Sequence, residues 1–321
     1  MAKKYDVVSV GSATVDCFVS LPVDFTHIRH GSKVLIDDMT LLTGGGGTNV
    51  AVGLARLGLK TGFIGEVGED LSAQLIKHEL AGEHVDFMVK SHSRHLTAYS
   101  VVLEAKGKDR SILVYKGASS FLHPEEIPKS LNTKWFYFAS VVGTSFKTMD
   151  TLSKFARKNR ISIFFNPSEY MIVNGGKIIK DIVSATTILS LNKEEAQLLT
   201  RSSSSSTHNL LKKLKMLGPE ICIITNGKEG VHVFDGKKFY FNRARKMHAV
   251  DTTGAGDAFG AGFLGGWISN EGLAHEKRMD ISMRMGLLES ESVISFIGAK
   301  KGLLHKKNIV QQLGGYDATH K

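Results

Sequence analysis

Short, uninterrupted apolar runs alternate along most of the chain with segments of helical periodicity. The runs are typical of strands buried on both faces, and they lie at 7–10, 63–65, 135–139, 161–165, 188–190 and 221–225. The helical segments lie at 50–57, 71–80, 148–158, 193–199 and 210–217, and again from residue 255 onward. Because this alternation is typical of βαβ units, it predicts an α/β fold with a mostly parallel central sheet covered by helices on both faces.

Two stretches, residues 12–43 and 95–119, lack helical periodicity. Within the second, residues 97–103 and 111–115 read as two strands of a hairpin around a polar turn at 106–109. Such stretches fit poorly into a parallel core, so we expect them to form one small β-sheet that projects from it as a lid. The predicted core then comprises residues 1–11, 44–94 and 120–321.

Composition narrows the class of protein. Of the 321 residues, 42% are apolar and 22% charged, which suits a compact fold. The net charge is +10, but the basic residues are scattered, so we expect anionic small ligands rather than nucleic acid. Two cysteines make no disulfide framework or zinc spacing. No apolar run approaches the roughly 18 residues that span a bilayer, so we expect a cytoplasmic protein without a membrane partner.

The most informative segment is Asp251-Thr252-Thr253-Gly254-Ala255-Gly256-Asp257, which opens a helix and follows a predicted hairpin with strands at 231–234 and 238–241. Its glycines permit a tight turn, after which the amides of Ala255, Gly256 and Asp257 should point outward without partners. Free amides at a helix N-terminus bind anions, and a phosphoryl group that is being transferred is an anion of this kind. The Asp257 carboxylate beside them could accept the proton of an attacking hydroxyl. A lone acid in a first helical turn would instead merely complement the helix dipole.

This segment resembles a signature of the ribokinase-like (pfkB) family of sugar and nucleoside kinases. Three further segments match in the same order: the run Gly44–Gly47 with Thr48-Asn49, the run Asn192-Lys193-Glu194-Glu195, and the run 297–302 near the C-terminus. The resemblance covers residues 5 to 305. It implies a three-layer ribokinase-like fold, with a small β-sheet lid beside the core.

The resemblance also implies roles for single residues. Asp257 would be the catalytic base, with Gly254, Ala255 and Gly256 as the anion hole. The substrate would be bound by Asp16, Gly45 and Asn49, with Asp16 placed at the end of the first strand. ATP would be bound by Asn192, Thr225 and Gly227. Glu195 and Asn192 would hold Mg²⁺ through water, and Asp251 and Thr253 would hold a monovalent cation such as K⁺.

The implied function is an ATP-dependent kinase that phosphorylates a hydroxyl of a small carbohydrate such as ribose or fructose. Two alternatives stay open: a nucleoside kinase of the adenosine or cytidine type, and an inactive binding protein of the same fold. A nucleoside needs an aromatic base pocket, for which Phe18, Phe25 and Phe121 are candidates. Gly46 stands where ribokinases often carry a lysine, so a direct cationic contact to the sugar is missing. A homodimer through the lid is also expected.

Overall fold

The computed structural model describes residues 3–89, 93–105 and 110–319, and its strands form two separate sheets. The larger sheet has the order β13-β12-β11-β10-β9-β8-β1-β4-β5. Its strands are β1 Lys4–Val10, β4 Thr61–Ile64, β5 Asp86–Phe87, β8 Asn132–Phe138, β9 Ser162–Phe165, β10 Ile188–Asn192, β11 Ile221–Thr225, β12 Val231–Phe234 and β13 Phe239–Asn242. Neighbours are parallel except for the antiparallel pairs of β12 with β11 and β13. The predicted mostly parallel sheet is confirmed.

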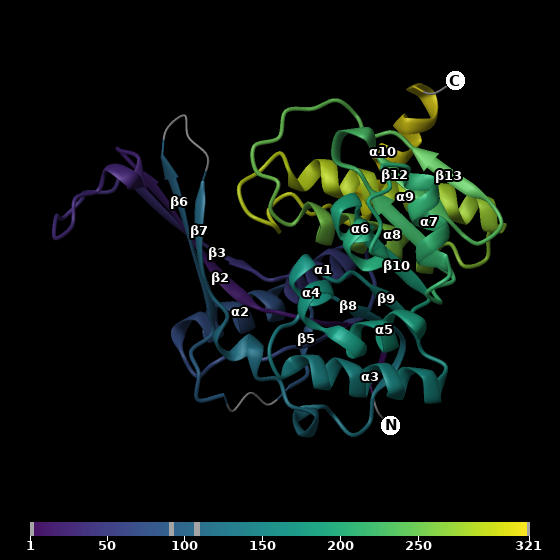
Figure 1. Cartoon of the computed structure of the whole chain (residues 1–321), viewed down its shortest axis with the longest axis horizontal. Helices are drawn as coiled ribbons and strands as arrows, with labels where there is room; N and C mark the ends of the chain where they lie inside the picture. The colour runs from purple at the N-terminus through teal and green to yellow at the C-terminus, as the bar shows by residue number, and fades with distance from the viewer. Residues whose placement is uncertain (1–2, 90–92, 106–109, 320–321) are drawn as a thin grey trace.

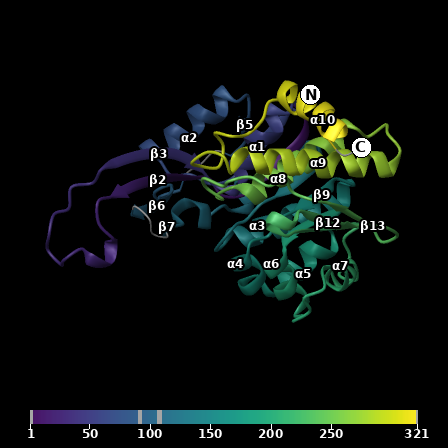
Figure 2. The same cartoon turned by 90° about the horizontal axis from the view of Figure 1, so that it is seen from above.

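Helices cover both faces of this sheet (Figure 2). Val7 and Val8 are neighbours in β1 but enter different hydrophobic clusters, because successive side chains of a strand point to opposite faces. The helices are α1 Gly46–Arg56, α2 Leu71–Gly82, α3 Ser145–Asn159, α4 Glu169–Asn174, α5 Gly176–Ser184, α6 Lys193–Thr200, α7 Thr207–Lys215, α8 Ala255–Ser269, α9 His275–Val293 and α10 Lys306–Thr319. Short 3₁₀ turns lie at η1 Phe25–His27, η2 Gly117–Ser120, η3 Pro124–Glu126 and η4 Gly227–Glu229. None of the helices described could span a bilayer, given their lengths and polar content.

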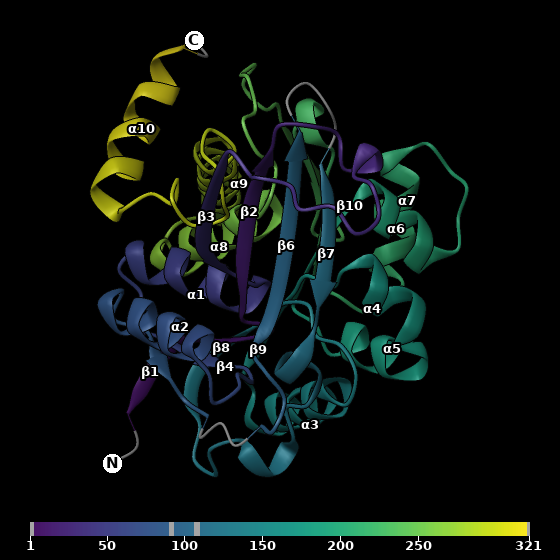
Figure 3. The ribbon, with the colours of Figure 1, turned by 90° about the vertical axis from the view of Figure 1, so that its left-hand side faces the viewer.

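The smaller sheet projects from one side of the core (Figures 1 and 3). Its order is β3-β2-β6-β7, with β2 Thr14–Leu21, β3 Asp38–Gly44, β6 Ala98–Ala105 and β7 Ser111–Tyr115. β2 and β6 are parallel although they are far apart in sequence, so this sheet joins two separated segments. The predicted turn at 106–109 lies outside the described residues. That this sheet moves as a lid stays a prediction.

The start of α1 differs from its prediction. The apolar pattern begins at Val50, but the helix begins four residues earlier, inside the glycine run. A Cβ on Gly47 would lie 2.6 Å from the Phe63 ring and 2.8 Å from the backbone of Gly11. The first turn of α1 therefore packs directly on β4 and on the end of β1, and only a residue without a side chain fits at position 47.

Glycines also decide how α8 packs. The run from Gly260 to Gly265 reads formally as a dinucleotide-binding pattern, but it lies inside α8 rather than at a turn from strand to helix. A Cβ on Gly262 would lie 2.5 Å from a carbonyl of α9, and one on Gly265 would lie 2.5 Å from Leu57. These glycines let α8 pack closely against α9 and the end of α1. This close packing also places the N-terminus of α8 beside α1.

A buried charge pair ties the base of the small sheet to the core. The Lys300 ammonium is 2.7 Å from Glu79 Oε2 on α2 and donates to Thr43 Oγ1 on β3 at 3.0 Å. Burial lowers the pKa of Lys300, although the charges of Glu79 and Asp16 oppose this shift. A buried ammonium needs such partners, so the loop after α9 is held against the small sheet and helix α2.

Candidate active site

A cavity of about 240 Å³ lies where the small sheet meets the glycine-rich starts of α1 and α8. It brings together six residues predicted from the sequence: Asp16, Gly45, Asn49, Thr253, Gly254 and Asp257. Its other lining residues are Ser12, Thr14, Gly46, Ala98, Ser100, Val114, Tyr115 and Lys116. The small sheet and the starts of α1 and α8 therefore form its walls.

The centre of the cavity is a hydrogen bond between the two helix starts. Asn49 Nδ2 donates to Asp257 Oδ2 at 2.8 Å, although the residues are 208 positions apart. Gly46 permits this approach, because its Cβ position would be 3.1 Å from Asp257 Oδ1. Asn49 Oδ1 is buried and has no hydrogen-bond partner among the described residues. A buried amide oxygen without a partner is costly, so this atom is suited to receive a ligand hydroxyl.

Two opposing effects set the proton affinity of Asp257. Burial raises the pKa of its carboxyl, whereas the Asn49 hydrogen bond and the charge of Lys300 lower it, and the pKa stays above its usual value. The side chain still lines the cavity, so its carboxylate can meet a ligand. A partly desolvated carboxylate with a raised pKa is a stronger base than one in water.

The backbone at the start of α8 matches its prediction in part. Gly254 is the N-cap with φ 76°, and the helix begins at Ala255. The amide of Ala255 donates to the Thr252 carbonyl at 3.3 Å, so the expectation that it is unpaired is wrong. Within the described residues, the amides of Gly256 and Asp257 make no hydrogen bond that would compete with an anion. The helix N-terminus thus offers two free donors.

Asp16 lies elsewhere than predicted. The first strand ends at Val10, and Asp16 belongs to β2 of the small sheet. Its side chain passes over Gly44, where any Cβ would overlap the carboxylate, and it accepts a hydrogen bond from Ser100. Burial raises the pKa of Asp16, opposed by Ser100 and by the charges of Lys300 and Lys116. A ligand held by both Asp16 and Asn49 would therefore contact both the small sheet and helix α1 of the core.

Lys116 is a cationic residue of the cavity that the sequence analysis missed. It follows β7 directly and lines the wall formed by the small sheet. The side chain is exposed overall, but burial of its ammonium lowers the pKa of Lys116, and only the charge of Asp16 opposes this. In the sequence, Lys116 looks like an ordinary solvated lysine at the end of a hairpin, and no motif around it predicts a site. Gly46 cannot supply a cationic contact from α1, but Lys116 can supply one from the end of β7 in the small sheet.

The residues predicted for the nucleotide lie at the carboxyl ends of β10 and β11. Asn192 and Thr225 are direct neighbours in the sheet, and Gly227 follows with φ 47° and open space at its Cβ position. Asn192 and Glu195 form a reciprocal cap of α6, with both hydrogen bonds at 2.8 Å. Because Asn192 Oδ1 accepts the Glu195 amide, its free group is an Nδ2 donor, which suits a phosphate oxygen better than a metal.

Glu195 fits a metal held through water. One carboxylate oxygen caps the helix, which leaves the other available. Burial raises the pKa of Glu195, the Asn192 amide opposes this, and the charges of Glu194, Glu169 and Asp257 raise it further. This concentration of negative charge favours a divalent cation nearby. In the described part of the chain no group of three or more His, Cys, Asp or Glu could hold a metal, so waters and phosphates would complete the shell.

Asp251 and Thr253 do not fit a monovalent cation. Asp251 Oδ1 accepts hydrogen bonds from the Thr253 amide at 2.9 Å, the Thr253 hydroxyl at 2.7 Å, and Arg110 Nη1. Asp251 Oδ2 accepts the Gly298 amide at 3.0 Å. A carboxylate oxygen offers about two lone-pair sites, so three donors saturate Oδ1 and one donor occupies half of Oδ2. One of these donors is the Arg110 guanidinium, which already supplies the positive charge that a cation would bring.

Of the three phenylalanines predicted to form a base pocket, Phe25 has a side chain that lies outside the described residues. Phe18 is buried in the small sheet, and Phe121 stacks on His95 with ring centroids 3.9 Å apart. Neither residue lines the cavity, whereas Tyr115 and Val114 of β7 do. Any flat apolar ligand group would therefore meet the small sheet at Tyr115.

Comparison with known proteins identifies the family of the chain. Residues 4–284 match the family described as pfkB family carbohydrate kinase. The chain is similar to a ribokinase of Haemophilus influenzae, with 26% identity over 95% of this chain and 97% of the relative. It is 31% identical to a fructokinase of Salmonella typhimurium over 71% of this chain and 77% of the relative. Among solved structures, the nucleoside kinase of Methanocaldococcus jannaschii superimposes with a TM-score of 0.81 at 19% identity, covering 98% of this chain and 100% of the other.

Two glycines of the anion-binding loop should respond differently to a methyl group. Gly254→Ala should destabilise the fold by more than about 1 kcal/mol, because φ is positive and the new Cβ would overlap Ala299. Gly256→Ala is the matched control: its Cβ position is open and helical, so stability should stay equal or rise by up to about 1 kcal/mol. Urea unfolding followed by circular dichroism measures both. Equal stability of the two variants would contradict this account of the loop.

Proposed function

The chain belongs to the pfkB family of carbohydrate kinases, and on that premise we propose that it transfers the γ-phosphoryl group of ATP to a hydroxyl of a small sugar such as ribose or fructose. The observation that carries this proposal is the Asn49–Asp257 pair in a cavity walled by the small sheet and the starts of α1 and α8. We place the enzyme in the cytoplasm, where ATP is available.

Asp257 is the proposed general base. The acceptor hydroxyl would lie against its carboxylate and give up its proton as it attacks the γ-phosphorus. Asn49 fixes the carboxylate with its amide group, and its unpaired Oδ1 can accept a second hydroxyl of the same sugar. Asp16 would accept a further hydroxyl from the opposite wall, so a polyol is oriented at three points.

The start of α8 is the proposed anion hole. The free amides of Gly256 and Asp257 would face the charge that develops on the phosphoryl oxygens, and Gly254 gives the loop its turn. Asn192, Thr225 and Gly227 would bind the rest of the nucleotide at the ends of β10 and β11. Mg²⁺ near Glu195 would neutralise phosphate charge when bound.

The small sheet is the proposed lid and the proposed dimer surface. Its cavity-facing residues would shield the reacting groups from water, which otherwise competes as an acceptor. Leu41 and Leu113 lie in one row with Cys17, one residue out of register with Asp16, so they face away from the cavity. These leucines are 47% and 62% exposed, which supports pairing with a second copy through this face.

A nucleoside is the second candidate acceptor. It is favoured by Tyr115 and Val114, which offer an apolar wall at the mouth of the cavity. The similarity of the fold to a nucleoside kinase agrees with this candidate but does not favour it over a sugar. The first candidate is stronger because the rest of the lining is polar and suited to hydroxyl groups.

Replacement of the proposed base tests the mechanism. Asp257→Asn keeps the shape of the side chain and its contact with Asn49, so ATP affinity should persist while turnover falls by about 10²- to 10⁴-fold. ATP binding by calorimetry and turnover by ADP release measure the two effects. Asp181→Asn, on the distant helix α5, is the control for a lost carboxylate. A variant at position 257 with wild-type turnover would refute the assignment.

An acceptor panel decides between the candidates. Ribose, fructose, adenosine and cytidine are supplied with ATP and Mg²⁺, together with sugar acids and sugar phosphates because of Lys116. We expect a neutral sugar to give the highest kcat/KM, with the phosphorylated product identified by mass spectrometry. Preference for adenosine or cytidine would establish the nucleoside alternative. ATP and sugar binding without any phosphorylated product would establish an inactive binding protein.

The pH profile should report the Asn49 hydrogen bond. This bond lowers the pKa of Asp257, so Asn49→Ala should raise that pKa further above its usual value. Because a base acts only when deprotonated, the acid limb of the kcat/KM profile should move to higher pH. Ser12→Ala alters the same cavity without touching Asp257 and should leave the limb in place. An unmoved limb in the Asn49 variant would mean that another group titrates there.

A further inference from the structure

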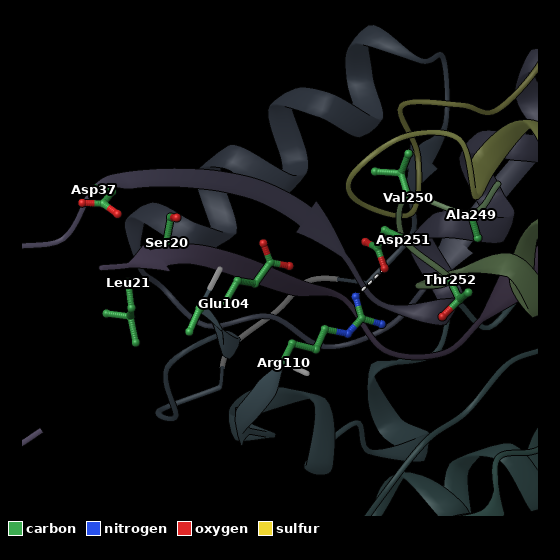
Figure 4. A pocket seen from close by; sticks show the side chains of 10 residues that line it. Ser20, Leu21, Asp37, Glu104, Arg110, Ala249, Val250, Asp251 and Thr252 are labelled. Carbon is green, nitrogen blue, oxygen red and sulfur yellow. Dashed lines mark hydrogen bonds and ion pairs between the residues drawn. The ribbon is translucent and has the colours of Figure 1, made fainter. Parts of the chain in front are cut away.

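The positive charge beside Asp251 comes from the small sheet (Figure 4). Arg110 directly precedes β7, whereas Asp251 lies in the core loop that leads into α8. They meet at the wall of a second cavity, of about 560 Å³, which separates the small sheet from residues 249–252. This ion pair is therefore a bridge between the two parts of the structure.

Asp251 requires this partner because it is buried. Its side chain is 4% exposed, and that of Arg110 is 29% exposed. Burial would raise the pKa of Asp251, but hydrogen bonds from Arg110, Thr253 and Gly298 outweigh burial and keep its pKa below the usual value. An ionised carboxylate in such a place is stable only when a cation and hydrogen bonds compensate its charge.

The same carboxylate organises the anion-binding loop. It holds Thr253 from one side and Gly298 from the other, and these residues flank the contact between Gly254 and Ala299. The turn at Gly254 directs the free amides of the α8 N-terminus toward the cavity. The group that neutralises the charge of Asp251 therefore influences how the amides at the start of α8 are oriented.

We propose that Arg110 is a positioning residue that supplies the positive charge at Asp251 in place of a monovalent cation. The order of the anion-binding loop then depends on the position of the small sheet and not on K⁺. Only the catalytic consequence rests on the proposed function, whereas the charge compensation at Asp251 is independent of it. Arginine suits this task because its charge is permanent and its planar group fits a carboxylate.

The first test uses the wild-type chain in chlorides of potassium, sodium and tetramethylammonium at equal ionic strength. Tetramethylammonium is too large to enter a site built for K⁺. Both turnover and the thermal unfolding temperature should be the same in all three salts. Potassium that raises either quantity above its value in tetramethylammonium would show a cation site and overturn the proposal.

The second test removes the guanidinium. Arg110→Met keeps the aliphatic stem, and misplacement of the loop should lower kcat by about 10²-fold with a smaller change in the KM for the sugar. Added guanidinium ion should restore part of the turnover, which a purely structural defect would not allow. Arg110→Lys should retain part of the activity because it keeps the charge. Arg29→Met removes an exposed arginine from the same part of the chain and should behave like the wild type.

The outcomes separate this proposal from the proposed function. If no acceptor is phosphorylated but the unfolding temperature of the wild type ignores K⁺ and that of Arg110→Met rises with guanidinium, the charge compensation stands without the kinase. If the wild type is an active kinase that requires K⁺, the kinase stands without the role of Arg110. Wild-type turnover in Arg110→Met would overturn the proposal even if K⁺ has no effect.

Discussion

The site depends on how closely two helix N-termini approach each other. α1 and α8 both begin within glycine runs, and their first turns meet so closely that Asn49 and Asp257 share a hydrogen bond of 2.8 Å. A side chain at Gly46 would occupy the space that this approach needs, and one at Gly254 would overlap Ala299. Both helix dipoles then point their positive ends at the same small volume, where a ligand rich in oxygen is favoured.

Acidic and basic side chains around this volume partly compensate one another's charges. Burial raises the pKa values of Asp16 and Asp257, and the charge of Lys300 opposes both shifts. The Lys300 ammonium is itself paired with the Glu79 carboxylate. The charge of Asp16 favours the protonated form of Lys116, and the charge of Arg110 compensates that of Asp251. Since a buried charge without a partner is expensive, the site cannot lose one of these residues without disturbing the others.

The sequence predicted what local patterns encode. Alternating runs identified the parallel sheet, and the glycine runs identified the helix starts, because a turn or close approach there excludes other residues. It failed where distant segments meet. Asp16 was assigned to the end of β1 although it belongs to β2 of the small sheet, Lys116 read as a surface residue, and the pairing of Arg110 with Asp251 joins residues 141 positions apart. No periodicity records such contacts, because only the packing of the two sheets creates them.

The cavity lies between the small sheet and the helix starts of the core, and this arrangement bears on the order in which ligands would bind. A ligand that contacts only the ends of β10 and β11 gains nothing from the small sheet and cannot shift its position. A polyol held by Asn49 on one wall and by Asp16 on the other would bind most tightly when the walls are close, so its binding would favour a closed arrangement. On the proposed function, the acceptor rather than the nucleotide would then be the ligand whose binding energy excludes water, and this would restrict transfer of the phosphoryl group to complexes in which an alcohol is already in place.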